Sequence, residues 1–263
     1  MDDPTGNEMV PATNQPLAGK VALVTGGAGG IGAAICEALA AQGAAVLVGY
    51  NTSRDAAALL AERLPHVAAP HAALAVPVTD SAALAALAAH IEARHGRLDI
   101  LVNCHGTTRF VPHADLDALD DALFDQVMAT NVRGAFATVR ALRKLLERDG
   151  DGLVVNISSI AATLAMGSNV AYCASKAALD NMTKSLARAL APAIRVVSVQ
   201  PGLVQTEFVK AFDPAWIENY MRSTPLKRMV PPGDIAAAVI AVATTLKSLT
   251  GTILPVDAGR TLG

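Results

Sequence analysis

Short runs of β-branched and aliphatic residues recur along the chain, and longer Ala- and Leu-rich stretches separate them. Several short runs are apolar at every position, which is typical of strands buried on both faces of a parallel sheet. The pattern predicts seven strands, over 21–25, 45–50, 74–78, 100–103, 153–157, 195–199 and 252–256.

The longer stretches predict helices over 32–42, 54–64, 81–95, 117–148, 170–190 and 235–246. Strands that alternate with helices of this length form βαβ units, in which helices cover both faces of a parallel sheet. We therefore expect a single α/β domain over 17–263, after a disordered lead-in over 1–16.

One irregular stretch, 202–234, interrupts the alternation with four prolines and the only Trp. A long excursion of this kind inside a compact domain is typical of a binding lid, which we place at about 203–232. A plain surface connection is the alternative.

The composition is apolar without the pattern of a membrane protein. Of 263 residues, 52% are hydrophobic and 17% are charged, and the formal net charge of −2 provides no basic field for nucleic acid or an anionic membrane. The longest uncharged stretches, 152–175 and 21–36, are interrupted by seven Asn, Ser and Thr residues and by five glycines, so neither predicts a membrane span. The acidic N-terminus is not a signal peptide, and we expect a cytoplasmic protein with reduced cysteines.

A glycine-rich turn follows the first predicted strand. Gly26, Gly30 and Gly32 have the spacing G-x-x-x-G-x-G, and a helix follows. Glycine lets the backbone approach a phosphate, and the helix N-terminus presents free N–H groups and the positive end of its dipole. The turn therefore favours a dinucleotide pyrophosphate, and the alternative is a turn that only allows tight strand–helix packing.

Tyr172 and Lys176 are four positions apart in a predicted helix, so their side chains share a face. A nearby ammonium favours the phenolate, and we expect it to lower the pKa of Tyr172 from about 10 toward the working pH of a general acid or base. Alone, the pair could be two solvated residues. However, Ser159 and the glycine-rich turn both follow predicted strands, and active sites of parallel sheets form beyond the carboxyl ends of strands.

The order and spacing of these motifs resemble the classical short-chain dehydrogenase/reductase family, most closely its 3-oxoacyl-carrier-protein reductase branch. The resemblance runs from about residue 17 to the end. Residues 25–32 match the family's T-G-x-x-x-G-I-G motif and 201–202 match its P-G motif, while 103–106 keep the first and last residues of its N-N-A-G motif. It implies a Rossmann fold, which is a doubly wound seven-stranded parallel sheet with helices on both faces. It also implies NAD(P)-dependent interconversion of a ketone and a secondary alcohol by hydride transfer.

The resemblance assigns roles to the matched residues. Ser159 would polarise the substrate oxygen, and Tyr172 would exchange a proton with it. Lys176 would hold the nicotinamide ribose and lower the pKa of Tyr172, and Asn131 would position a water in a proton relay. The residues implied around the cofactor are Gly26, Gly29, Gly30, Ile31, Gly32, Tyr50, Asn51, Thr52, Ser53, Arg54, Val78, Asn103, Gly106, Tyr172, Lys176, Pro201, Gly202, Val204 and Thr206.

The end of the second predicted strand distinguishes NAD from NADP. An acidic residue there binds the ribose 2′-hydroxyl and repels a 2′-phosphate, whereas this chain has Tyr50. Residues 51–54 offer donors, and the guanidinium of Arg54 suits a phosphate. We expect NADP(H) to be favoured over NAD(H), the alternative being that Ser53 only caps the next helix and Arg54 is solvated.

Cys104 and His105 replace the Asn-Ala of the family motif. Adjacent residues at a strand end point to opposite sides and cannot readily share a metal, so we expect no metal and assign the pair to structural or cofactor-pocket packing. Pro77 stands where many relatives have an Asp that contacts adenine, so the backbone of Val78 would take that role.

The substrate wall is expected from 107–112, 161–169 and 203–229. The wall is largely apolar, although the same side chains could equally pack the lid on the core. A 3-oxoacyl thioester, a sugar, a steroid or another small alcohol would be compatible. The apolar residues are Leu164, Met166, Phe208, Trp216 and Met221, and the cations available to an anionic group are Arg109, Lys210 and Arg222.

Two non-enzymatic classes remain as alternatives. A dinucleotide-sensing regulator would not need Ser159, Tyr172 and Lys176, and a scaffolding subunit would show no turnover.

In the family, the segments matching 117–148, 170–190 and 235–263 contact partner subunits, and here all three are rich in Ala, Leu and Val. Because homo-oligomer interfaces are more apolar than ordinary surface, we expect a homotetramer.

Overall fold

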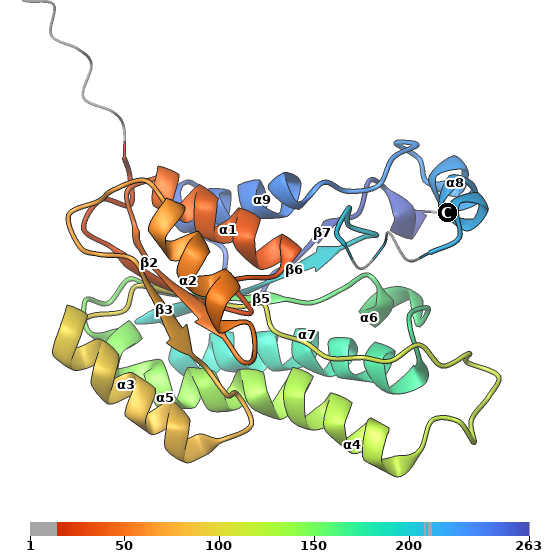
Figure 1. Ribbon diagram of the computed structural model, residues 1–263, viewed down its shortest axis with the longest axis horizontal. Coiled ribbons are helices and arrows are strands. Elements are labelled where there is room, and N and C mark those ends of the chain that lie inside the picture. Colours follow the sequence, from red (N-terminus) through yellow and green to blue (C-terminus); the bar gives the residue numbers. More distant parts are fainter. Residues whose placement is uncertain (1–14, 208, 210–211, 263) are drawn as a thin grey trace, which may run out of the picture.

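Seven parallel strands form one sheet in the order β3-β2-β1-β4-β5-β6-β7. The computed structural model (Figure 1) describes residues 15–207, 209 and 212–262. This strand order reverses between β1 and β4, as in a doubly wound dinucleotide-binding sheet, and it confirms the predicted fold class. The strands are β1 Val21–Thr25, β2 Ala45–Tyr50, β3 Ala72–Ala75, β4 Ile100–Asn103, β5 Gly152–Ile157, β6 Ile194–Pro201 and β7 Ile253–Val256.

Helices cover both faces of the sheet, with α1, α2 and α9 on one side and α3, α5 and α7 on the other (Figure 1). Alternate strand residues build the two cores: Val24 faces Ile35 and Val239, whereas Leu23 faces the opposite helices. The helical segments are α1 Gly30–Ala41, α2 Arg54–Arg63, α3 Ser81–His95, α4 Asp121–Met128, η1 Ala129–Gly134, α5 Ala135–Glu147, α6 Ala161–Leu164, α7 Val170–Leu190, α8 Pro214–Ser223, α9 Pro232–Thr244 and η3 Arg260–Leu262.

Most predicted elements lie within three residues of their expected bounds, and two depart in a way that the local sequence explains. The strand expected at 74–78 is β3 at Ala72–Ala75, and Pro77, which has no N–H to donate to a ladder, lies just beyond it. The long helix expected over 117–148 begins only at Asp121, where Asp120 caps it by accepting from the N–H of Leu123 at 2.7 Å. A π-helical turn, Ala129–Gly134, then separates α4 from α5.

The excursion over 202–234 is not irregular throughout, because it contains α8. Asp213 accepts from the N–H of Ala215 at 2.9 Å, and Pro214 occupies the first turn, so the N-terminus of α8 is capped by local sequence. The role of this segment as a substrate lid stays a prediction.

The lead-in predicted over 1–16 falls largely on residues 1–14, which lie outside the described residues. Among the helices described, none is long and apolar enough to cross a membrane.

Candidate active site

The glycine-rich turn joins β1 to α1 at the carboxyl edge of the sheet. Gly26 has a φ of +65°, and a Cβ there would lie 3.1 Å from the carbonyl oxygen of Cys104. A Cβ on Gly32 would collide with the carbonyl oxygen of Gly26, so the turn closes tightly onto the helix. Gly29 precedes α1 without a side-chain cap, and the first turn carries no acid. The N–H groups of Gly30 and Ile31 therefore fit a pyrophosphate.

The segment after β6 lies over this glycine-rich turn and the start of α1, which together are called the cradle below. A Cβ on Gly30 would be 2.8 Å from Cγ2 of Thr206, so Thr206 sits at the start of α1. Val204 forms an isolated parallel bridge with Val230, which ties the two ends of the excursion together. The predicted residues Pro201, Gly202, Val204 and Thr206 line one pocket together with Ile31.

Cys104 and His105 pack behind the cradle. The hydroxyl oxygen of Thr25 lies 2.6 Å from Nδ1 of His105 and accepts from the N–H of Cys104 at 3.1 Å. Burial lowers the pKa of His105 to about 4 and raises the pKa of Cys104 to about 12, so both are neutral near pH 7. The part of the chain that the structure describes contains no cluster of three potential metal ligands. These contacts agree with the packing role that we assigned to the pair.

Asn103 ends β4 with its side chain directed along the sheet. Its Nδ2 donates to Oδ1 of Asn156 at 2.9 Å, and Asn156 donates in turn to Thr183 at 2.9 Å. This buried chain ties β4 to β5 and α7, while Oδ1 of Asn103 is buried without a hydrogen-bond partner among the described residues.

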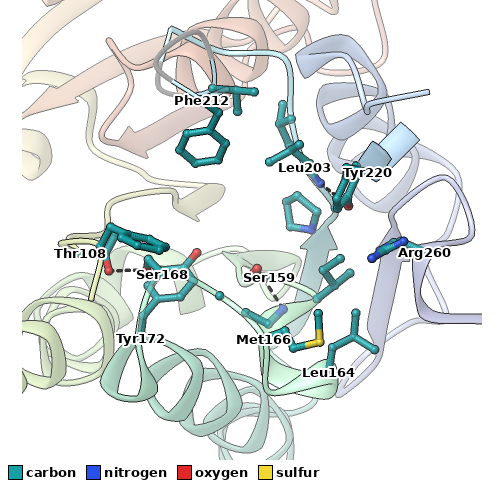
Figure 2. A pocket seen from close by; sticks show the side chains of 18 of the residues that line it. Thr108, Ser159, Leu164, Met166, Ser168, Tyr172, Leu203, Phe212, Tyr220 and Arg260 are labelled. Carbon is teal, nitrogen blue, oxygen red and sulfur yellow. Dashed lines mark hydrogen bonds between the residues drawn. The ribbon is translucent and has the colours of Figure 1, made fainter. Parts of the chain in front are cut away.

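Ser159 and Tyr172 line the same pocket, whose volume is about 740 Å³ (Figure 2). Ser159 follows the end of β5, and Tyr172 lies in the first turn of α7, which Asn169 caps by accepting from the N–H of Tyr172 at 2.7 Å. Lys176 is buried one turn later. Its Nζ donates to the carbonyl oxygen of Ile157 at 2.9 Å and lies 5.7 Å from the ring centroid of Tyr172.

The electrostatics of the pair differ from the expectation that Lys176 lowers the pKa of Tyr172. Burial raises the pKa of Tyr172, and a hydrogen bond with Ser159 offsets only part of this increase. Burial also lowers the pKa of Lys176 to about 8, while Cys104 and Asp180 act in the opposite direction. The expected lowering was wrong for this structure, because burial of the phenol is the largest cause of the shift and Lys176 is not among the groups that produce it. The ammonium instead donates to the Ile157 carbonyl.

Asn131 lies in the π-helical turn η1, 1% exposed. Its Oδ1 accepts from the N–H of Thr107 at 2.8 Å, and its Nδ2 donates to the Thr107 carbonyl at 3.1 Å and to Oγ of Ser175 at 3.0 Å. A Cβ on Gly106 would lie 3.5 Å from Oδ1 of Asn131 and 3.8 Å from Nζ of Lys176, so these three residues are brought together. Single π-helical turns recur at functional sites.

The residues expected to choose the cofactor lie at the carboxyl end of β2. Residues 51–54 are exposed, and Ser53 makes no side-chain capping bond to α2. No ion pair of Arg54 occurs in the described part of the chain. Val78, by contrast, is buried, and its side chain meets Gly134.

The outer part of the pocket is apolar and comes from the three segments expected to form the substrate wall. Phe110, Leu164, Met166, Leu203 and Trp216 all line it. Met221 is not among the lining residues, and Phe208 and Lys210 lie outside the described residues.

The cations in this wall are not those expected from the sequence. Arg109 donates to the carbonyl of Ala118 at 3.1 Å and Arg222 donates to Asn219 at 2.8 Å, and neither lines the pocket. Arg260 lines it instead. No sequence pattern marks Arg260, because it reaches the pocket only through packing of the C-terminal turn on α8.

A glycine cradle at a helix N-terminus, beside a Ser, Tyr and Lys cluster on a doubly wound sheet, defines a dinucleotide-dependent oxidoreductase. A family model described as "Enoyl-(Acyl carrier protein) reductase" matches residues 26–261. "Granaticin polyketide synthase putative ketoacyl reductase 2" of Streptomyces violaceoruber is 37% identical, over 95% of this chain and 99% of its own. D-threitol dehydrogenase of Mycolicibacterium smegmatis is also 37% identical, over 94% of each chain.

Two solved structures have the same fold. One is a "putative short-chain dehydrogenase/reductase" from Burkholderia xenovorans, with a TM-score of 0.85, 35% identity and coverage of 93% of this chain and 98% of its own. The other is RhlG of Pseudomonas aeruginosa in an NADP complex, with a TM-score of 0.85, 33% identity and coverage of 95% and 99%. The chain belongs to the short-chain dehydrogenase/reductase family. It is an NAD(P)-dependent oxidoreductase that interconverts a carbonyl compound and an alcohol.

Proposed function

We propose that Tyr172 is the general acid and base of this reaction and that Ser159 holds the substrate oxygen. The observation that carries the proposal is that both side chains line one pocket beside the cradle. When bound, the nicotinamide supplies or accepts the hydride at the carbonyl carbon. In reduction, Tyr172 gives its phenolic proton to the substrate oxygen while the Ser159 hydroxyl donates a hydrogen bond to the same oxygen.

Lys176 and Asn131 support this proton transfer. The Lys176 ammonium holds the ribose hydroxyls, and Asn131 positions a water that connects Lys176 to solvent. A Cβ on Gly106 would lie 3.5 Å from Oδ1 of Asn131 and 3.8 Å from Nζ of Lys176, and this proximity supports their acting together. Val204 and Thr206 hold the carboxamide, and their place over the start of α1 supports this role.

NADP(H) is the favoured cofactor in this proposal. Ser53 does not cap α2, and the exposed Arg54 forms no ion pair among the described residues, so both can contact a 2′-phosphate. The similarity to RhlG, solved with NADP, also supports it. Paired titrations with NADPH and NADH test the preference, and tighter binding of NADH would overturn it.

A 3-oxoacyl thioester is the proposed substrate class, because Phe110, Leu164 and Met166 give the outer pocket apolar walls that suit an acyl chain. A small sugar alcohol is the second candidate, which the similarity to D-threitol dehydrogenase favours.

We further propose a cytoplasmic homotetramer. The free thiols of Cys36, Cys104 and Cys173 support the compartment, and exposed aromatic side chains on α4 and α5 support the assembly.

Tyr172→Phe tests the assignment. We expect NADPH binding to persist and ketone reduction to fall by about 100- to 10,000-fold, because the proton donor is lost without loss of the ring. NADPH fluorescence measures binding and also confirms that the variant folds. Unchanged reduction rates in Tyr172→Phe would contradict the mechanism. A wild-type protein that binds NADPH but reduces no thioester, diketone, sugar or steroid would favour the sensor alternative.

A further inference from the structure

We propose that Arg260 is a specificity residue that binds an anionic oxygen group of the substrate, a carboxylate or a phosphate, at the end of the pocket away from Tyr172. The inference rests on the proposed function and adds a substrate class to it. The substrate would be a ketone, or the corresponding alcohol, with an apolar portion between the reacting carbon and the anionic group.

Arg260 reaches the pocket from the short helix η3, which follows β7. Figure 2 shows Arg260 and Tyr172 on opposite sides of the pocket, with Ser159 between them in this view. The side chains of Leu164 and Met166 also line the pocket. The lining therefore places a cation, an apolar wall and the reacting residues around one cavity.

The guanidinium of Arg260 is held in a defined orientation by α8. It lies 4.7 Å from the ring centroid of Tyr220, and its Nη1 donates to Oγ of Ser223 at 2.7 Å. The Tyr220 hydroxyl accepts from the N–H of Leu203 at 3.2 Å, so the ring that supports the guanidinium is itself fixed. Stacking on an aromatic ring leaves the edge of a guanidinium available for bidentate contact with an oxyanion.

The positive charge of Arg260 has no partner of opposite charge in the described part of the chain. The nearest acid in sequence, Asp257, uses its two oxygens to accept from the N–H groups of Gly259 at 2.9 Å and Thr261 at 2.8 Å. Burial raises the pKa of Tyr220, which keeps that phenol neutral. A guanidinium with four further N–H groups beside an apolar cavity favours an oxyanion.

The competing explanation is that Arg260 only fastens α8 to the C-terminal turn. If Arg260 had only a structural role, its substitution would weaken the binding of neutral and charged ligands equally. If Arg260 binds an anion, its substitution would weaken the binding of charged ligands alone. Arg222 lies on α8, the helix that Arg260 contacts, but does not line the pocket. It therefore provides a matched control for the removal of one positive charge.

The experiment measures binding of unreactive ligands to the NADPH-bound protein by calorimetry. The probes are straight-chain carboxylates from butyrate to octanoate, the matching alkyl phosphates and the matching alcohols. We expect at least one anion to bind roughly tenfold or more tightly than its alcohol, as for a hydrogen bond to a charged group. Arg260→Gln should abolish this preference, Arg260→Lys should keep part of it, and Arg222→Gln should leave it unchanged.

Equal binding of anions and alcohols by the wild-type protein would overturn the proposal, as would an equal loss for both in Arg260→Gln. Turnover then identifies the source of the anion. Levulinate against its methyl ester tests a carboxylate on the substrate, and acetoacetyl-coenzyme A against acetoacetyl-N-acetylcysteamine tests a phosphate on the acyl carrier. If none of these ketones is reduced, the proposed 3-oxoacyl substrate class fails, while the binding result still decides the role of Arg260.

Discussion

At the scale of single residues, Ser159, Tyr172 and Lys176 form the centre of the candidate site, and Arg260 lies at its outer end. Ser159, Tyr172 and Lys176 were predictable because their motif spacing places them at the end of β5 and the start of α7. Arg260 was not predictable, because it meets Tyr220 only through tertiary packing. The direction of the Tyr172 pKa shift was also not predictable, since it depends on the burial of the phenol and on its hydrogen bond with Ser159.

The pKa of Lys176 predicts how cofactor binding depends on pH. Burial lowers this pKa to about 8, so the side chain is charged below that pH and loses its proton above it. If the ammonium holds the ribose hydroxyls, NADPH affinity should fall as the pH rises through about 8, and Lys176→Arg should remove this dependence because Arg stays charged. Fluorescence titration of NADPH from about pH 6.5 to about pH 10 measures it. A wild-type affinity that does not change over this range would exclude the role.

At the scale of elements, prediction succeeded where local sequence marks both ends. Helices α3 and α7 have the predicted bounds: Asp80 accepts from the N–H groups of Ala82 and Ala83, Gly96 closes α3 at a φ of +66°, and Asn169 caps α7. Helix α8 was missed because its four-proline surroundings suggested irregular structure, although Asp213 and Pro214 are a helix start signal.

Contacts between elements could not be predicted from the pattern. Asp180 on α7 is buried and accepts from Ser198 at 2.6 Å and from Gln200 at 2.6 Å, both on β6. Gln200 also donates to Thr163 on α6 at 3.2 Å. Sequence alone indicates a helix and a strand here, whereas the structure shows a polar network that joins them behind the substrate wall.

A second contact of this kind predicts an effect on stability. Asp99 accepts from the N–H of Val21 at 2.9 Å and from Lys20 and Arg97, so it joins the start of β1 to the residue before β4. Burial alone would raise the pKa of Asp99, but the hydrogen bonds from Arg97, Val21 and Lys20 outweigh burial and lower it. We expect Asp99→Asn to reduce the free energy of unfolding by about 2 kcal/mol at neutral pH.

The sign of the Asp99 effect follows from the lowered pKa. A carboxyl whose folded-state pKa is depressed stabilises the fold above its unfolded value of about 3.9, and this contribution is lost as the pH falls through the folded value. The difference between Asp99→Asn and wild type should therefore shrink below about pH 4. Urea unfolding across the pH range measures it, and a difference that grows on acidification would contradict the assignment.

At the scale of the whole molecule, the two cores bury aliphatic side chains on both sides of the sheet, but several large aromatic side chains stay on the surface. The inner strands are buried on both faces, with Val24 and Val48 in one core and Leu23 and Leu47 in the other, whereas the edge strands β3 and β7 are only partly buried. On α4 and α5, however, Phe124 is 40% exposed and Phe136 is 41% exposed. Apolar side chains on neighbouring exposed helices favour association with another copy of the chain.

This surface predicts a change of oligomeric state in designed variants. We expect a homotetramer in the wild type, and we expect Phe124→Asp with Phe136→Asp to give a smaller species, because two charges in an apolar interface are not compensated. Leu59→Asp on α2 is the matched control, since Leu59 is 54% exposed but lies outside the segments expected to contact partners. Sedimentation velocity measures the mass of each variant. A wild-type protein that sediments as a monomer would refute the assembly, and an unchanged mass in the double variant would place the interface elsewhere.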